Sequence, residues 1–123
     1  MRLKLGEIVD MYTGLNKFGN KEMPIQCSLI ILNDITELDP KVKMYESKRS
    51  ELVTKYSEKD ENGDPIQENG MIKLSDEKKF MKEFTEMINT EFDVNLEKIH
   101  TDWLQGILVT PAELVGIKKL IEE

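Results

Sequence analysis

The sequence predicts an α+β protein that is predominantly helical. We expect an antiparallel helical hairpin plus further helices, with a small β-hairpin in the 60–74 connection and one or two short strands near 92–109. Apolar residues recur at three- and four-residue steps along most of the first 90 residues, which is typical of amphipathic helices. Asn-Gly pairs then indicate tight turns, and apolar and polar residues alternate further on. The length of 123 residues fits a single domain, 1–123.

Two helices are expected in the first third of the chain. The first is predicted over residues 5–17 and ends at Gly19 and Asn20. Its apolar face consists of Leu5, Ile8, Val9, Tyr12 and Leu15. The second begins with Pro24 at its first position, and its apolar face consists of Ile25, Leu29, Leu32 and Ile35. Residues common in strands are frequent over 25–36, so a buried strand is the competing interpretation, and the sequence leaves this choice open.

The next two helices are expected to form the hairpin. Asp39-Pro40 predicts the start of a third helix that runs to about Glu58, because Asp is a favoured cap and Pro suits a first turn. Its apolar face consists of Val42, Tyr45, Leu52, Val53 and Tyr56. Ser75 predicts the cap of a fourth helix that ends near Glu91, with the stripe Phe80, Phe84, Met87 and Ile88. Such helices, joined by a compact connection, should pack antiparallel, with Leu52 and Phe84 facing each other.

The connection begins like a calcium-binding loop, with Asp60, Asn62 and Asp64 at alternate positions. A calcium loop of the helix–loop–helix kind also needs Gly at its sixth position and Glu at its twelfth. Pro65 and Met71 occupy those positions. The sequence therefore argues against calcium binding and favours a turn.

The turn interpretation has its own support. Asn62-Gly63 and Asn69-Gly70 both favour the positive φ angles of tight turns. We expect a short β-hairpin around Asn69-Gly70.

The C-terminal third changes its periodicity. The alternation in FDVNLEKI, residues 92–99, predicts a strand, and the apolar run 107–109 is its candidate partner. A last helix is predicted from Pro111 to the end, with Thr110 as its cap and Glu113 completing a capping box. Its apolar face consists of Leu114, Ile117, Leu120 and Ile121.

Charge is distributed unevenly along the chain. The net charge of −7 argues against direct nucleic-acid binding, which depends on clustered Lys and Arg. Residues 41–59 hold six basic and three acidic side chains, whereas residues 60–77 hold one basic and six acidic ones. The simplest interpretation is a set of solvated helix faces beside a polar turn. The alternative is a partner-binding surface, for which the candidate residues are Asp60, Glu61, Asp64 and Glu68.

Catalytic signatures are absent from the sequence. His100 is the only histidine, and although Glu97 precedes it by three residues, a di-iron site needs a second such motif. Cys27 lies in an apolar run and is expected to be a buried, inert thiol. Phosphate-binding loops and paired cysteines for zinc are also missing. We therefore expect no enzyme, no cofactor and no metal site.

Trp103 is the only tryptophan, and two roles compete for it. Core packing is the first, and an anchor at a protein interface is the second. We include it as a candidate partner-binding residue.

The cellular setting is predicted from simple features. A single cysteine fits a reducing compartment, and the start of the chain does not resemble a signal peptide. The longest apolar stretch, LIIL, is too short to span a membrane, so no membrane association is expected.

Six segments together cover nearly the full length: LKLGEIVDMYTGLNKF, KEMPI, LVTKYSEKDENG, GMIKL, FDVNLEKI and ILVTPAELVGIKKLIEE. In these segments the chain resembles a family of small phage and prophage proteins of Gram-positive bacteria that is known as a domain of unknown function. The resemblance implies a phage setting and carries over no catalytic or binding residue.

Two functions compete on these grounds. The first is a non-catalytic phage accessory protein in the host cytoplasm that binds a host or phage protein, with a host defence nuclease as a candidate target for the acidic surface. The second is a minor structural or assembly component of the virion. The identity of the partner and the oligomeric state stay open.

Overall fold

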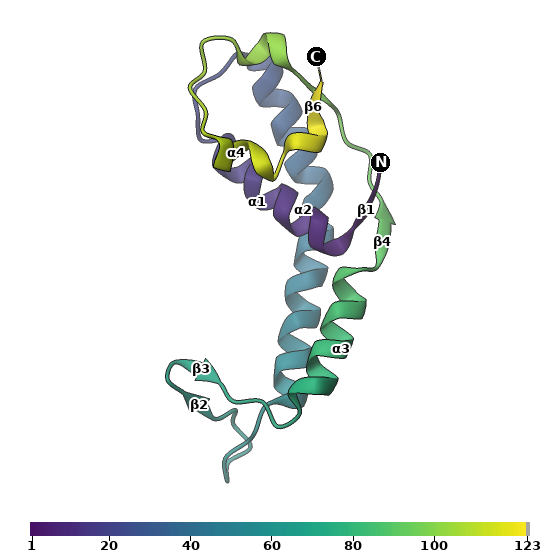
Figure 1. Ribbon diagram of the computed structural model, residues 1–123, viewed down its shortest axis with the longest axis vertical. Coiled ribbons are helices and arrows are strands. Elements are labelled where there is room, and N and C mark those ends of the chain that lie inside the picture. Colours follow the sequence, from purple (N-terminus) through teal and green to yellow (C-terminus); the bar gives the residue numbers. More distant parts are fainter. Residues whose placement is uncertain (123) are drawn as a thin grey trace.

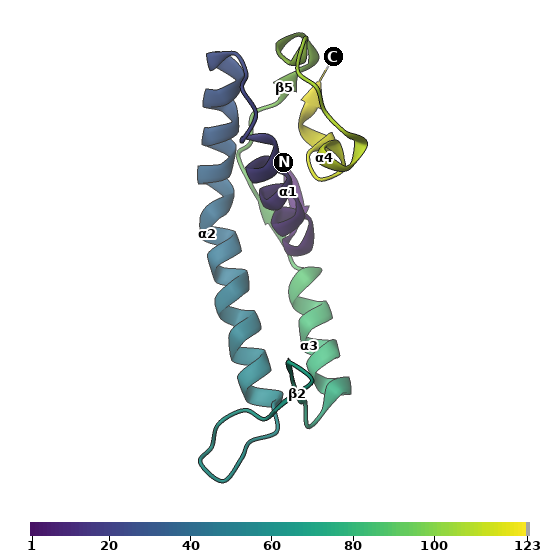
Figure 2. The same ribbon diagram turned by 90° about the vertical axis from the view of Figure 1, so that its left-hand side faces the viewer.

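The computed structural model describes residues 1–122 and is elongated, with one long helix running along almost its whole length (Figures 1 and 2). The helices are α1 (Leu5–Phe18), α2 (Ile25–Tyr56), α3 (Glu77–Ile88) and α4 (Pro111–Val115), with the 3-10 turns η1 (Thr101–Leu104) and η2 (Lys118–Leu120). The strands are β1 (Arg2–Lys4), β2 (Gln67–Glu68), β3 (Met71–Ile72), β4 (Glu91–Asp93), β5 (Ile99–His100) and β6 (Ile121–Glu122). The predicted class, α+β and predominantly helical, is confirmed.

The molecule divides into two regions along α2. We call residues 1–42 and 91–122 the head, where α1 and the C-terminal segment cover the first part of α2. We call residues 43–90 the arm, where the second part of α2 lies beside α3 and ends in the β2–β3 hairpin (Figure 2).

The second and third predicted helices are one continuous helix, α2. The prediction of a new start at Asp39-Pro40 is wrong, and so is the alternative of a strand over 25–36. Asp39 does not cap, because its carboxylate accepts hydrogen bonds from the Tyr12 hydroxyl (2.9 Å) and pairs with the Lys43 ammonium (3.0 Å). Pro40 removes one helical hydrogen bond. It lies on the exposed side of α2, where water can replace that bond, and packing on both sides of Pro40 keeps the helix continuous. Pro24, predicted as the first helical residue, is the N-cap instead.

The core lies in the head. Every fully buried apolar side chain belongs to this region: Leu3, Leu5, Ile8, Met11, Leu15, Phe18, Cys27, Ile31, Leu38, Val42, Val94, Ile99, Ile117 and Leu120. The first helix forms close to its predicted bounds. The face that the first part of α2 buries differs from the predicted face: Ile31 and Leu38 point inward, whereas Ile25, Leu29 and Leu32 are exposed. The predicted inward residues Ile35 and Val42 do pack against the core, Ile35 only in part.

The arm is the predicted antiparallel helical hairpin. Its apolar residues are at most half-buried, and α3 has no fully buried residue. The Phe84 ring packs against the Tyr45 ring of α2, with ring centroids 6.3 Å apart, and against Phe80 in its own helix at 5.9 Å. Asp76, rather than the predicted Ser75, caps α3 by accepting a hydrogen bond from the Lys79 amide.

The connection between the two arm helices contains the predicted β-hairpin. β2 and β3 pair antiparallel around Asn69 (φ 53°) and Gly70 (φ 79°), the positive-φ pair that a tight hairpin turn needs. The Glu58 amide donates to the Lys73 carbonyl at 2.8 Å, so the hairpin is tied to the end of α2.

Strand pairing in the head was predicted only in part. A strand forms at Glu91–Asp93 rather than over the whole of 92–99, and its antiparallel partner is β1 at the start of the chain. The predicted partner, 107–109, is not a strand. The chain beyond β4 is held by side chains instead, because the Asp34 carboxylate accepts a hydrogen bond from the Glu97 amide at 2.8 Å.

The predicted last helix is correct at its start and too long. The Thr110 hydroxyl accepts from the Glu113 amide at 3.3 Å, but α4 ends at Val115, and β6 pairs in parallel with β5. The backbone of Gly116, where α4 ends, crosses α1 so closely that an added Cβ would lie 2.9 Å from the Asp10 carbonyl oxygen, so a glycine is needed at this crossing. Residue 123 lies outside the described residues.

Candidate partner-binding surfaces

The four acidic candidates lie at the free end of the arm. Asp60, Glu61, Asp64 and Glu68 are all exposed. They belong to the loop beyond the last turn of α2 and to the adjoining hairpin, at the lower end of the molecule in Figure 1. The sequence grouped these residues correctly, and the fold displays them away from the head.

Asp60 has a structural task in this loop. Its Oδ1 accepts hydrogen bonds from the backbone amides of Asn62 (2.9 Å) and Asp64 (3.0 Å). Its own amide donates to the Asp64 carbonyl at 2.9 Å, which closes the turn. Asp60 therefore shapes the loop. The carboxylates of Glu61, Asp64 and Glu68 are exposed to solvent and do not take part in the hydrogen bonds of this turn.

None of the four acidic candidates forms an ion pair within residues 1–122. Acidic residues elsewhere commonly do, and the pairs include Glu58 with Lys73, Glu83 with Lys55, and Glu51 with Lys48. Lysines in the basic second half of α2, such as Lys48 and Lys55, thus pair with carboxylates other than these four. The end of the arm keeps a concentration of uncompensated negative charge.

Trp103 lies in the other region. It belongs to η1 in the head, where it packs against the core, and its ring meets His100 edge-on with ring centroids 4.7 Å apart. The structure therefore does not bring Trp103 together with the acidic candidates. Its half-buried position favours the packing role.

A further surface was missed by sequence reasoning. Ile25 (67% exposed), Leu29 (58%) and Leu32 (60%) form a stripe on the outer side of α2, opposite the core. The sequence assigned these residues to the interior. The available signal was the run Leu29–Leu32, which is apolar around the whole helix circumference, so that one side had to remain outside.

A groove lies beside this stripe. It has a volume of about 240 Å³ and is bounded by the end of α1 and by α2, with the lining residues Asn16, Gly19, Asn20, Met23, Ser28, Ile31, Leu32 and Ile35. None of these residues is charged, and Leu32 belongs to both the groove and the stripe. The two features form one continuous uncharged surface, which we call the α2 outer face.

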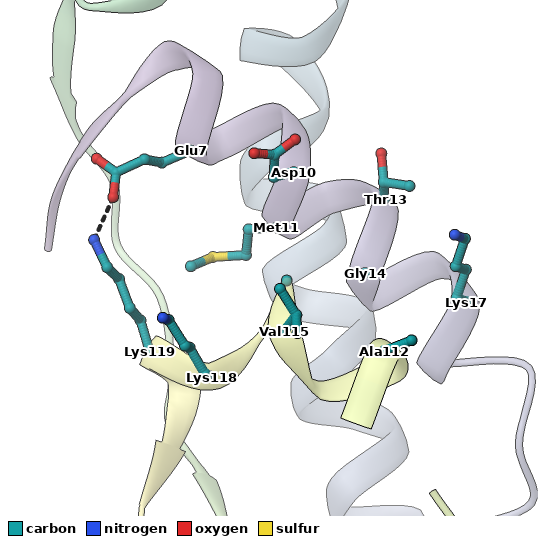
Figure 3. Close-up of a pocket in the computed structure, with 11 residues that line it drawn as sticks. Glu7, Asp10, Met11, Thr13, Gly14, Lys17, Ala112, Val115, Lys118 and Lys119 are labelled. Carbon is teal, nitrogen blue, oxygen red and sulfur yellow. Dashed lines mark hydrogen bonds and ion pairs between the residues drawn. The ribbon is translucent and has the colours of Figure 1, made fainter. Parts of the chain in front are cut away.

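A second hollow, between α1 and α4, is strongly charged (Figure 3). It has a volume of about 380 Å³, and the Lys119 ammonium pairs with the Glu7 carboxylate across it, while Asp10, Lys17 and Lys118 also line it. The ion pair with Lys119 lowers the pKa of Glu7, with a smaller contribution from the Lys4 amide. Because Lys119 pairs with Glu7 across it, this hollow has the features of a contact between α1 and the C-terminal segment.

Asp34 is the one fully buried carboxyl group in the described chain. Removal from water raises its pKa from the ordinary 3.8 to about 6. Its Oδ1 accepts from the Glu97 amide, and its Oδ2 has no hydrogen-bond partner among the described residues. The group joins α2 to the segment before β5.

The remaining reactive side chains lie apart. Cys27 is fully buried, and burial raises the pKa of its thiol. The Nε2 atom of His100 lies 3.8 Å from a carboxylate oxygen of Glu122, and the His100 ring packs edge-on against the Trp103 ring. Over residues 1–122, no three His, Cys, Asp or Glu side chains gather in a way that could hold a metal ion.

Comparison with family models, curated proteins and solved structures finds no match for this chain. The resemblance to phage proteins therefore stays a prediction. None of the helices in the described part of the chain has both the length and the apolar character needed to cross a membrane.

Proposed function

We propose that this protein acts by binding another protein, without catalysis, and that the end of the arm is the binding element. The observation that carries the proposal is the set of four exposed carboxylates with no ion-pair partner within residues 1–122. Since a surface of this kind attracts cations, the partner should present a basic surface.

A basic nucleic-acid groove is the partner surface that fits best. The arm narrows to a single loop and hairpin (Figure 1), and such a projection can enter a groove that a globular surface cannot. Carboxylates spaced along a loop can occupy sites that otherwise bind phosphates. In the phage setting that the sequence predicts, a host defence nuclease is a partner of this class, and the protein would act in the host cytoplasm.

The test is a capture experiment with matched charge variants. The tip variant carries Glu61→Lys, Asp64→Lys and Glu68→Lys, and retains Asp60 because it shapes the loop. The control variant carries Glu46→Lys, Glu97→Lys and Asp102→Lys, which change the net charge equally at exposed sites away from the tip.

Proteins captured from a Gram-positive host lysate by the wild type and by the control should be lost with the tip variant. Duplex DNA and moderate salt should displace them, because both screen or compete for exposed charges. Capture of the same proteins by the tip variant would refute the proposal.

The second candidate, a minor structural or assembly component of the virion, is favoured by the α2 outer face. Exposed apolar surface is typical of proteins that assemble with other subunits. Purified phage particles would then contain the protein in a fixed ratio to the major virion proteins.

A further inference from the structure

The α2 outer face differs from the rest of the surface in its chemistry. One third of all residues are charged (33%), yet residues 23–36 contain a single charged residue, Asp34, and this residue is buried. The exposed polar side chains of residues 25–36 are all uncharged: Gln26, Ser28, Asn33 and Thr36. Depletion of charge around exposed aliphatic residues is typical of the centre of a protein interface.

The groove supports the same conclusion independently. The hollow between α1 and α4 is lined by charged residues of both signs, and so is a hollow between α2 and α3 in the arm, where Lys48, Lys55 and Glu83 lie. The groove beside Leu32 has no charged lining residue. A projecting stripe and a receiving groove therefore lie next to each other on one surface. A two-fold interface needs both on the same surface, because each subunit presents an identical patch to the other.

We propose that the α2 outer face binds a second copy of this chain, in an antiparallel pairing of the two α2 helices over residues 25–36. With the two-fold axis near Leu29, Ile25 of one copy lies opposite Leu32 of the other, since the two residues are three to four positions on either side of the axis. Leu29 then meets its own equivalent, and the groove on each subunit receives apolar side chains from the other.

Charge restricts where a second copy can bind. Two copies that each carry −7 repel each other, and contact over residues 23–36 brings no exposed charged side chains together, because the one charged residue there, Asp34, is buried. Charge also selects the antiparallel orientation. A parallel pair would place the two acidic arm ends side by side, whereas an antiparallel pair separates them.

The size of the face sets the strength of the dimer. Twelve helical residues span about 18 Å, so the stripe and groove are smaller than the roughly 800 Å² per partner of a standard interface. We therefore expect a reversible dimer with dissociation in about the micromolar range.

The arrangement has a consequence for the arms. From Leu29 to the end of α2 at Tyr56 the helix extends for about 40 Å, at 1.5 Å per residue. The antiparallel dimer would thus hold its two acidic ends about 80 Å apart and directed oppositely. Dimerisation does not depend on the proposed binding role of those ends.

Sedimentation equilibrium of the full chain, from low micromolar to several hundred micromolar, tests the proposal. The wild type should shift from monomer to dimer, and Leu29→Glu should remain a monomer because two carboxylates would meet at the axis. Ser47→Glu is the matched control. It adds the same charge five turns further along the same side of α2 and should dimerise like the wild type. Unchanged circular dichroism would show that both variants fold.

Charge-swap mixtures then test the geometry. Leu29→Glu mixed with Leu29→Lys should restore a dimer, and so should Ile25→Glu mixed with Leu32→Lys. Restoration by Ile25→Glu with Ile25→Lys instead would show a parallel pair and overturn the orientation.

A wild type that stays monomeric throughout, or a Leu29→Glu variant that still dimerises, would overturn the proposal as a whole. The tip variant with Glu61→Lys, Asp64→Lys and Glu68→Lys should dimerise normally. A failure of the arm-end proposal can therefore be told apart from a failure of this one.

Discussion

The head and the arm share the α2 helix but differ in how they are held together. In the head, α1 and the C-terminal segment enclose side chains from which water is fully excluded, such as Phe18 and Leu38. In the arm, no apolar side chain between Val42 and Val94 is fully buried, and the contact with α3 rests on half-buried rings. Since buried apolar area is the main source of stability, most of the folding free energy should come from the head.

This difference has a mechanical meaning. The arm depends on α2, which is anchored in the head, more than on its own packing. Regions with few buried apolar contacts open locally at lower free energy than the core does. An arm that opens while the head stays folded could adjust the acidic end to a partner.

The largest expected effect is in the head. Phe18→Ala should cost about 3–5 kcal/mol of unfolding free energy, because it removes a fully buried ring and leaves a cavity. Urea denaturation measures this value. Met81→Ala, at an exposed site in the arm, is the control and should stay within about 0.5 kcal/mol. A cost below about 1 kcal/mol for Phe18→Ala would mean that the head is not the main core.

The second effect is a pH dependence that arises in the head from Asp34. Its pKa in the folded protein, about 6, lies above the ordinary 3.8, so the folded state binds more protons between these values. The free energy of unfolding should therefore rise as the pH falls from 7.5 to 5, by about 1.4 kcal/mol.

Asp34→Asn should remove most of this slope and keep the hydrogen bond to the Glu97 amide. Glu37→Gln is the matched control, since the exposed Glu37 carboxylate accepts a similar bond from the Asn95 amide at 3.1 Å. Urea denaturation at several pH values measures how the free energy of unfolding changes with pH. If this pH dependence were equal in Asp34→Asn and the wild type, Asp34 would not be its source.

Sequence reasoning succeeded where the signal is local. The bounds of α1, the arm hairpin and the turn at Asn69-Gly70 all follow from spacing and turn chemistry within a few residues. It failed where contacts between segments far apart in the sequence determine the local structure. Asp39-Pro40 has the local features of a helix start, but contacts with Tyr12 and Lys43 override them. The β1–β4 pair joins residues about 90 positions apart, and no local pattern indicates it.

The candidate surfaces follow the same rule. The acidic cluster could be predicted because charged residues in a polar turn are exposed in almost any fold. The lack of ion pairs around it depends on where the lysines lie and required the structure. The α2 outer face was missed because Leu29–Leu32 is apolar on every side of the helix. Packing against α1, and the hydrogen bond that the Glu97 amide donates to Asp34, determine which side faces inward.

A smaller effect is expected in the arm. Phe84→Ala should cost about 1–2 kcal/mol, less than a buried ring, because Phe84 is only half-buried. In hydrogen exchange, the α3 amides should lose protection while the α1 amides keep theirs. Leu52→Ala, on the facing side of the arm, should give the same pattern more weakly. Equal loss of protection in α1 and α3 would show that the two regions unfold as one unit.

The smallest effect on stability is expected at the end of the arm, where it is also the most local. Asp60→Ala removes the acceptor for the amides of Asn62 and Asp64, so these two amides should exchange faster with solvent and shift in NMR spectra. The global free energy of unfolding should change by less than about 0.5 kcal/mol, because the loop lies beyond the last turn of α2 and covers no part of the core. Glu61→Ala is the matched control, since it removes one neighbouring carboxylate and no bond of the turn, and it should leave both amides protected. If Glu61→Ala disturbed the loop as much as Asp60→Ala, charge repulsion rather than the Asp60 hydrogen bonds would determine its shape, and a partner would then meet a loop without a defined conformation.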